Sequence, residues 1–232
     1  MNGADGKPFK TRDGGVMRLE NLVRDTNSEM VRKIRESAEN RGDGQISEDD
    51  ADETAKIVGL AALKYGDLSN QAAKDYVFDI DRFTSSEGNT GPYILYTIVR
   101  IKSILAKYWE QTRSGTAAAD KTPGQASEEE KERLFAGLKL QKPENPSEKE
   151  LCLLLAQFNA MMENAATELA PHKVCGYIYD VANAFNHFYH ETKILAEQDE
   201  ERRQGLIALL VLARDVLNTC IDVLGFSAPE RM

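Results

Sequence analysis

Apolar residues recur every three or four positions through most of the chain, which is the spacing of one face of an α-helix. The clearest example lies within 173–195, where a single stripe is made of Ile178, Val181, Ala182, Phe185 and Phe188. We expect this stripe to be buried in a helical core. The same kind of pattern predicts further helices over 28–37, 47–64, 93–111, 147–162 and 202–224, and another that starts at Ser127.

Two short stretches depart from the helical period. Tyr76, Phe78 and Ile80 alternate with one valine and two aspartates, and a period of two predicts a short, half-buried strand over 75–81. The apolar residues within 16–23 fit neither period, and we interpret them as a strand that leads into a turn.

Turn-forming and capping residues mark the ends of the predicted helices. Residues 85–91 have the composition of a turn, and Pro92 then fits a first helical turn, where its missing N–H costs nothing. A Ser-x-x-Glu capping box begins at Ser147. Gly225 is a typical residue to end the last helix. Residues 114–126 are small and polar, as in a surface loop.

The net charge bears on the class of ligand. The chain of 232 residues carries a formal charge of −9, which by itself opposes nucleic-acid binding, because Lys and Arg supply most of the affinity for phosphates. Acidic residues concentrate at 48–53, 128–130 and 197–201, near predicted helix starts, where carboxylates complement the helix dipole. A local basic face is therefore compatible with the negative total.

The lengths of the apolar runs and the spacing of the cysteines indicate where in the cell the protein functions. No apolar run approaches the length that crosses a bilayer, and no charged-then-apolar leader opens the chain. We therefore expect a cytoplasmic protein that does not bind a membrane, and we separately expect a monomer. Cys152, Cys175 and Cys220 are widely spaced within apolar helical patterns, which predicts buried, reduced thiols instead of a metal site or a redox pair.

A face of the predicted helix 93–111 carries candidate binding residues. Tyr93, Tyr96 and Arg100 fall three and four positions apart, so they share one face. Two tyrosine rings and a guanidinium on one face favour the stacking of unpaired bases.

The glycine-rich beginning of the chain is a second candidate site. Lys7, Lys10 and Arg12 cluster on it. Glycines allow close approach of the backbone to a phosphate, and the cations neutralise its charge. A flexible basic terminus is an equally good interpretation of this segment considered alone.

The stretch 79–96 resembles a signature of arginyl-tRNA synthetases, which runs Asp-x-x-Arg-Met-x-Ser-Phe-Glu-Gly-Asn-Thr-x-Pro-Tyr-x-Gln-Tyr. Two departures affect side-chain detail, since Ser86 stands at an aromatic position and Leu95 stands at the glutamine position. The run Lys-Pro-Phe-Lys-Thr-Arg at 7–12 is similar to a divergent form of the second nucleotide-binding signature of class I synthetases. The ending Ala-Pro-Glu-Arg-Met at 228–232 resembles the terminus of the same family.

The resemblance implies a mainly α fold with two parts. Residues 1–87 would be the mostly helical end of a class I catalytic domain, with the signature loop and helices that contact the tRNA stem. Residues 88–232 would be an all-helical anticodon-binding bundle. The parent enzyme would ligate arginine to its tRNA through an aminoacyl-adenylate, using ATP with Mg²⁺.

The resemblance also assigns site residues. The ATP-binding loop would contain Lys7, Lys10, Thr11 and Arg12, with Pro8 where the usual signature has its first lysine. Arginine tRNA would be bound by Tyr93, Tyr96, Arg100, Tyr189, Lys193 and Met232.

The catalytic constellation is incomplete in this sequence. Class I synthetases need a His-x-Gly-His signature, and the histidines here are His172, His187 and His190. We therefore expect the carboxyl-terminal part of a longer enzyme that is inactive by itself and binds no ATP alone. His187 and His190 could share a helix face, but no cysteine or carboxylate cluster completes a zinc site, so we expect no metal site.

A function of another class stays open. The chain could be a non-enzymatic helical adaptor in which Tyr93, Tyr96 and Tyr189 hold a protein helix, or a stand-alone tRNA-binding module. Strongly salt-dependent binding of a tRNA would separate a nucleic-acid binder from an adaptor.

Overall fold

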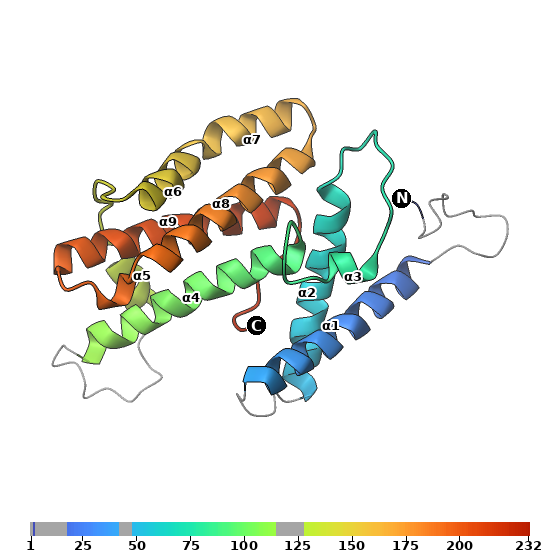
Figure 1. The fold of residues 1–232 in the computed structure, drawn as a ribbon, viewed down its shortest axis with the longest axis horizontal. Helices are drawn as coiled ribbons and strands as arrows, with labels where there is room; N and C mark the ends of the chain where they lie inside the picture. Colours follow the sequence, from blue (N-terminus) through green and yellow to red (C-terminus); the bar gives the residue numbers. More distant parts are fainter. Residues whose placement is uncertain (1, 3–17, 42–47, 115–127) are drawn as a thin grey trace. The chain divides into compact units, whose positions relative to one another are not determined.

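The computed structural model describes residues 2, 18–41, 48–114 and 128–232. Within these ranges the chain folds into helices, as expected for a mainly α fold, and no strand is present (Figure 1). In chain order the helices are α1 (Leu19–Arg41), α2 (Glu48–Leu68), α3 (Ile80–Phe83), α4 (Gly91–Ser114), α5 (Glu128–Ala136), α6 (Pro146–Ala156), α7 (Phe158–Thr167), α8 (Pro171–Glu191), the 3-10 helix η1 (Ile194–Ala196) and α9 (Glu200–Val223).

The chain forms two compact units, and each is built from segments that are distant in the sequence. Unit 1 contains Met1–Val99, Asn159–Tyr179 and Asn218–Met232, and unit 2 contains Arg100–Phe158 and Asp180–Leu217. Helices α4, α8 and α9 are continuous and contribute residues to both units.

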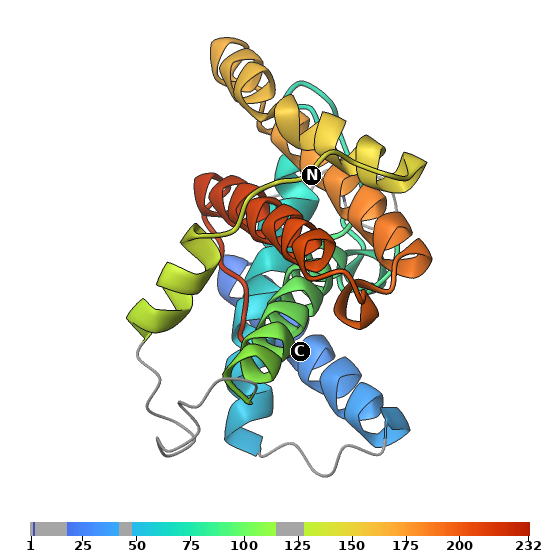
Figure 2. The ribbon, with the colours of Figure 1, turned by 90° about the vertical axis from the view of Figure 1, so that its left-hand side faces the viewer.

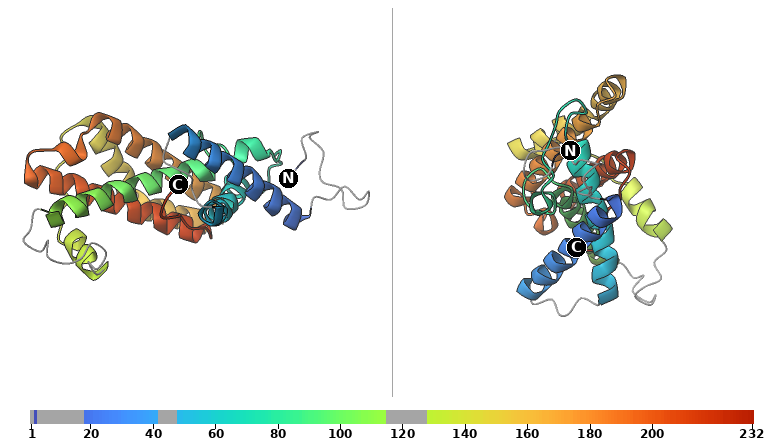
Figure 3. Two further views of the ribbon diagram at one scale, coloured as in Figure 1. Left: turned by 90° about the horizontal axis from the view of Figure 1, so that it is seen from below. Right: turned by 90° about the vertical axis from the view of Figure 1, so that its right-hand side faces the viewer.

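Unit 1 contains a pair of packed helices, α1 and α2. The chain reverses between them, so that α2 runs back beside α1 (Figures 1 and 3). Several small residues of α2 are completely buried, among them Ala51, Ala55 and Ala62. At Gly59 a Cβ atom would lie 2.2 Å from Oδ1 of Asn27 on α1. A larger side chain at Gly59 would therefore force Asn27 to move.

The strand predicted within 16–23 is wrong, because helix α1 begins at Leu19. The buried positions of α1 recur every four residues and are Leu22, Thr26, Met30, Ile34 and Ala38. Thr26 is fully buried although it is polar, so it interrupts the apolar pattern from which a helix would be predicted. Residues 16 and 17 lie outside the described part of the chain.

The strand predicted over 75–81 is also wrong. Val77 forms an isolated parallel bridge with Asn2, and helix α3 begins at Ile80. Asp79 caps this helix, since its carboxylate accepts a hydrogen bond from the Arg82 N–H at 3.1 Å. This cap satisfies a free N–H group of the first turn and ends the extended backbone.

The loop between α3 and α4 has the predicted turn conformation. Gly88 adopts a φ of +78°, which favours glycine. Thr90 caps α4, because its Oγ1 accepts from the Tyr93 N–H at 3.3 Å and donates to the Ser85 carbonyl at 2.6 Å. Pro92 lies in the first turn of α4, as predicted.

Unit 2 has a core of large apolar side chains. The stripe predicted on α8 is confirmed, since all five of its members are buried; Ile178 belongs to unit 1, and the other four belong to unit 2. Other helices of unit 2 also contribute buried apolar side chains. These include Ile101 and Leu105 of α4, Leu151 and Leu155 of α6, and Leu206, Ile207 and Leu210 of α9.

Helix α6 starts and ends at other residues than predicted. Its N-cap is Asn145 instead of Ser147, since the Asn145 carboxamide accepts from the Glu148 N–H at 2.8 Å and Pro146 occupies the first turn. The predicted helix 147–162 is divided in two at Gln157, whose N–H donates to the Leu154 carbonyl at 3.0 Å. Of the predicted apolar positions, Leu151 is completely buried, whereas Met162 is partly exposed.

Helix α9 ends as predicted, at a glycine with a left-handed backbone. Gly225 has a φ of +79°, and the Phe226 N–H donates to the Ile221 carbonyl at 3.1 Å, the hydrogen bond that ends a helix in a Schellman motif. The segment 225–232 then runs beside α2 within unit 1 (Figures 1 and 2). Among the described residues, no helix is long and apolar enough to cross a membrane.

Candidate nucleic-acid interface

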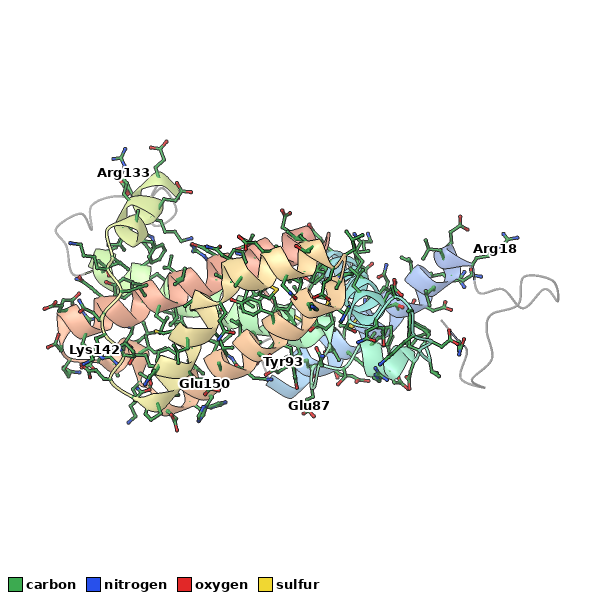
Figure 4. All side chains as sticks on the ribbon, turned by 90° about the horizontal axis from the view of Figure 1, so that it is seen from above. Arg18, Glu87, Tyr93, Arg133, Lys142 and Glu150 are labelled. Atoms are coloured by element: carbon green, nitrogen blue, oxygen red, sulfur yellow. The ribbon has the colours of Figure 1, made fainter. Side chains whose placement is uncertain are left out.

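Tyr93 lies in the first turn of α4, within unit 1 (Figure 4). It is only partly exposed, and its ring centre lies 5.7 Å from that of Tyr179 on α8 at an interplanar angle of 59°. One part of the ring therefore packs against a second tyrosine. Tyr93 is less open than a free stacking surface would be.

Tyr96 is more accessible and keeps 38% of its surface exposed. Tyr93, Tyr96 and Arg100 lie three and four positions apart on the continuous helix α4, so they share one face of it. The predicted spacing is therefore present in the structure. Whether this face binds RNA stays a prediction.

In unit 2, Arg100 of α4 is held by two residues of α8. Its Nη1 donates to Oδ1 of Asn186 at 2.8 Å, and its guanidinium carbon lies 5.5 Å from the ring centre of Tyr189. A guanidinium at this distance from an aromatic ring is attracted to the ring. The structure thus brings together two residues, Arg100 and Tyr189, that are far apart in the sequence.

The Tyr189 ring is supported from within its own helix. It stacks on Phe185 with centres 6.0 Å apart and an interplanar angle of 21°, and His190 lies beside it at 6.0 Å. Phe185 is fully buried, whereas Tyr189 keeps 37% of its surface exposed. Tyr189 is therefore a fixed aromatic ring with an open part, which is the geometry that base stacking requires.

Lys193 lies beyond the end of α8, although the helical pattern predicted within 173–195 includes it. Helix α8 ends at Glu191, and Lys193 is the exposed residue that precedes η1. Because Lys193 is not part of α8, its separation of four positions from Tyr189 does not place the two side chains on one helix face.

Met232 belongs to unit 1, whereas Tyr189 and Lys193 belong to unit 2. Its side chain is partly buried. The segment that leads to it contacts α2, where Lys64 Nζ donates to the Gly225 carbonyl at 2.5 Å. Recognition of an anticodon base by Met232 remains a prediction.

The predicted ATP-binding loop, with Lys7, Lys10, Thr11 and Arg12, lies outside the described residues. The structure therefore does not test it. In the ranges that the structure covers, no group of three or more His, Cys, Asp or Glu side chains could hold a metal ion. His187 lies between two exposed carboxylates, with Nδ1 3.6 Å from Glu150 and Nε2 3.3 Å from Glu191.

The cysteines have the environments that the sequence predicted, with one exception. Cys175 and Cys220 are fully buried, and burial raises the pKa of each thiol to about 12. Cys152 is only partly buried. Such high pKa values keep the buried thiols protonated and unreactive at neutral pH.

Sequence reasoning did not find Asn186, which fixes the Arg100 guanidinium. Asn186 and Tyr189 are three positions apart and each directly follows a phenylalanine of the apolar stripe of α8. A polar residue at helical spacing from Tyr189 was therefore the signal that could have identified Asn186. Lys64 was identified only as part of a predicted helix. Its contact with Gly225 joins residues 161 positions apart, and no local pattern in the sequence predicts such a pair.

The chain is similar to proteins of known families over its whole length. Residues 94–232 match the DALR anticodon binding domain, and residues 1–80 match the catalytic domain of class I tRNA synthetases (R). It is 56% identical to the arginine–tRNA ligase of Agathobacter rectalis and 47% identical to that of Alkaliphilus oremlandii, over 232 residues in each case. These alignments cover 100% of this chain but 36% and 35% of the two relatives.

Solved structures show the same fold. The arginyl-tRNA synthetase of Thermus thermophilus has a TM-score of 0.70 at 25% identity, over 94% of this chain and 33% of that one. The enzyme of Plasmodium falciparum has a TM-score of 0.68 at 24% identity, over 93% of this chain and 34% of that one. The chain therefore spans about a third of the length of the proteins it matches.

Proposed function

Because the chain belongs to the arginyl-tRNA synthetase family, in its carboxyl-terminal region with the DALR anticodon-binding domain, we propose that it binds the anticodon region of arginine tRNA. The observation that carries this proposal is the cluster of Arg100, Asn186 and Tyr189. It combines an exposed part of an aromatic ring with a cation fixed beside it. An unpaired base can stack on such a ring while the guanidinium attracts its phosphate.

The net charge of −9 makes fixed contacts more important for this function than a general positive field. Phosphate neutralisation supplies most non-specific affinity, and an acidic protein gains little from it. Tyr96 of α4 and Tyr189 of α8 keep 38% and 37% of their surfaces exposed. We assign these rings to stacking on the bases of the anticodon loop, and Lys193 to a phosphate nearby.

Substitution of Tyr189 and Tyr96 tests the proposal. We expect Tyr189→Ala and Tyr96→Ala each to weaken binding of an arginine tRNA transcript by about 1–3 kcal/mol, the usual value of one aromatic–base stack. Tyr189→Phe keeps the ring and should keep most of the affinity. Binding is measured by filter retention or fluorescence anisotropy, with thermal unfolding of each variant as the control.

Tyr93 needs a separate control, because its ring packs against Tyr179. Tyr93→Ala should weaken tRNA binding by about the same amount if the ring also stacks on a base. If Tyr93→Ala or Tyr96→Ala lowers the melting temperature while tRNA affinity is unchanged, that ring is part of the core and not of the interface.

For the whole protein we propose ligation of arginine to its tRNA. The arginine carboxylate would attack the α-phosphate of ATP, which forms arginyl-adenylate and releases pyrophosphate. A hydroxyl of the terminal ribose would then take the arginyl group and release AMP. In this scheme Lys7, Lys10, Thr11 and Arg12 bind ATP with its Mg²⁺, and arginine and ATP are bound by the full-length enzyme.

We propose that the functional boundary lies between residues 87 and 88. The residues before it would belong to the catalytic part and the residues after it to the anticodon-binding part. The matched regions, 1–80 and 94–232, leave residues 81–93 between them, which include the turn between α3 and α4. This placement is compatible with a junction in the loop before α4.

The salt dependence of binding separates this function from an adaptor that holds a protein helix. Binding to arginine tRNA should weaken steeply as salt rises, because each phosphate contact releases counterions. Tight binding to a helical peptide without measurable binding to tRNA would instead favour the adaptor.

A further inference from the structure

We propose that Lys64 and Tyr65 of α2 are positioning residues for tRNA recognition, because they hold the carboxyl-terminal segment 225–232 in place. This inference rests on the proposed function and on the prediction that Met232 contacts the tRNA. The segment and α2 belong to the same compact unit. They lie side by side in two views at right angles (Figures 1 and 2).

The polar contact is made at the residue where the chain leaves α9. Lys64 Nζ donates to the Gly225 carbonyl at 2.5 Å. A cation there also complements the negative end of the α9 dipole, where carbonyl groups lack helical partners. Gly225 has a φ of +79°, and a Cβ atom on it would lie 2.6 Å from Lys64 Nζ. The Lys64 ammonium group thus lies so close to the Gly225 backbone that a side chain at residue 225 would displace it.

The apolar contact is made one residue later. Phe226 is 6% exposed, and it meets the ring of Tyr65 edge-on, with centres 6.5 Å apart and an interplanar angle of 80°. Such an edge-to-face arrangement is favourable for aromatic pairs. Phe226 therefore anchors the segment on α2.

Tyr65 is itself fixed by two further parts of unit 1. The side chain is completely buried, and its hydroxyl lies 2.8 Å from the Cys175 carbonyl of α8 and 2.5 Å from Oδ1 of Asn89. Asn89 belongs to the turn that precedes α4. The ring that receives Phe226 is therefore held by α8 and by the turn that precedes the helix carrying Tyr93 and Tyr96.

These contacts determine the direction in which the last residues run. Pro229 is also buried, so the segment stays packed after Phe226. Lys64 and Tyr65 lie within the region matched by the synthetase catalytic domain, whereas Gly225 and Phe226 lie within the matched anticodon-binding domain. A helix of the first region would thus influence specificity in the second.

The test compares Lys64→Met with Lys56→Met. Lys56 is an exposed residue of the same helix, so both variants lose one positive charge from α2. We expect Lys64→Met to weaken binding of arginine tRNA at least about fivefold, with little change for a tRNA whose anticodon bases are altered. Lys56→Met should leave the preference between the two tRNAs unchanged, and Lys64→Arg should restore most of it.

A double-mutant cycle shows whether Lys64 acts through the terminus. In a chain that lacks Arg231 and Met232, Lys64→Met should have no further effect on tRNA affinity, because the residues it positions are gone. Equal losses in Lys64→Met and Lys56→Met, or an effect of Lys64→Met that adds in full to the truncation, would overturn the positioning role.

Hydrogen exchange separates failure of this inference from failure of the proposed function. Without tRNA, the peptide 226–232 should exchange its amide hydrogens faster in Lys64→Met than in Lys56→Met. Unchanged exchange overturns the positioning role alone. If the unaltered chain binds both tRNAs equally, the proposed function itself fails.

Discussion

Glu148 is a carboxylate with only 2% of its surface exposed, in unit 2. The Arg202 guanidinium donates to both carboxylate oxygens, and the Glu144 N–H donates to Oε2 at 3.0 Å. Burial opposes ionisation, yet these donors hold the pKa of Glu148 below its ordinary value. Loss of one partner of such a pair leaves a buried charge without compensation.

Glu148→Gln should lower the free energy of unfolding at pH 7 by about 3 kcal/mol, because Arg202 would lose its buried partner. Since the folded-state pKa is lowered, the contribution of Glu148 is present above its unfolded pKa of about 4.3 and is lost as pH falls through the folded value. The difference between the variant and the unaltered chain should therefore shrink below about pH 4. Denaturant unfolding at pH 7 and pH 3 measures it.

Glu144→Gln is the matched control. The Glu144 carboxylate also lies near Arg202, 3.3 Å from Nε, but its side chain is 70% exposed. Exposed ion pairs contribute about 0–1 kcal/mol, so this variant should unfold almost like the unaltered chain. If both variants lost the same free energy of unfolding, burial of the Glu148–Arg202 pair would not explain the effect of Glu148→Gln.

Prediction of single residues from the sequence depended on whether their role was local. The burial of the α8 stripe and of Cys175 followed from periodicity, because a helix repeats every 3.6 residues wherever it packs. The partners of Arg100 and Glu148 did not follow, since Asn186 and Arg202 lie 86 and 54 positions away. Such pairs depend on the packing of helices.

At the scale of elements, two glycines on helices have opposite surroundings. A Cβ at Gly91, in the first turn of α4, would lie 2.5 Å from the carbonyl oxygen of Ala61 on α2. That neighbour is backbone and cannot turn away as a side chain can. At Gly176 on α8, a Cβ would meet nothing within 4 Å. Both glycines belong to unit 1.

Gly91→Ala should therefore destabilise the chain by about 1–3 kcal/mol through overpacking of α4 against α2. Gly176→Ala should stabilise it by about 0.5–1 kcal/mol, because alanine has the higher helix propensity. Thermal unfolding of the two variants measures the difference. A stabilising Gly91→Ala would show that α2 and α4 approach less closely than in this structure.

The positions of helices could be predicted from the sequence where an apolar stripe was unbroken. Helices α4, α8 and α9 were located within a few residues for this reason. The interpretation failed at α1, where the buried Thr26 interrupts the stripe, and at Lys193, beyond the end of α8. It also failed at 75–81, where the capping effect of Asp79 starts a helix within an alternating pattern.

At the scale of the whole molecule, charge and stacking have different roles in the proposed function. With a formal charge of −9, the chain attracts phosphates weakly, so discrimination between tRNAs has to come from fixed contacts with bases. In the proposal, Tyr96 and Tyr189 would be such contacts in helices. Met232 would be a third, and it follows a helix that has ended at Gly225, so its position depends on how the terminal segment packs.

Removal of Arg231 and Met232 tests this arrangement. We expect the truncated chain to bind arginine tRNA at least about tenfold more weakly, or roughly 1.4 kcal/mol, because a flexible thioether would no longer cover an unstacked base. The melting temperature should change little, since Arg231 is exposed and Met232 is only partly buried.

A tRNA with altered anticodon bases provides the comparison for the truncated chain. The truncated and intact chains should bind it about equally weakly, because the contact that is lost is specific for the correct base. The terminus has no role in reading the anticodon if the truncation leaves the affinity for arginine tRNA intact. The same conclusion follows if it weakens both tRNAs alike, since a general loss of charge from Arg231 would then account for the effect.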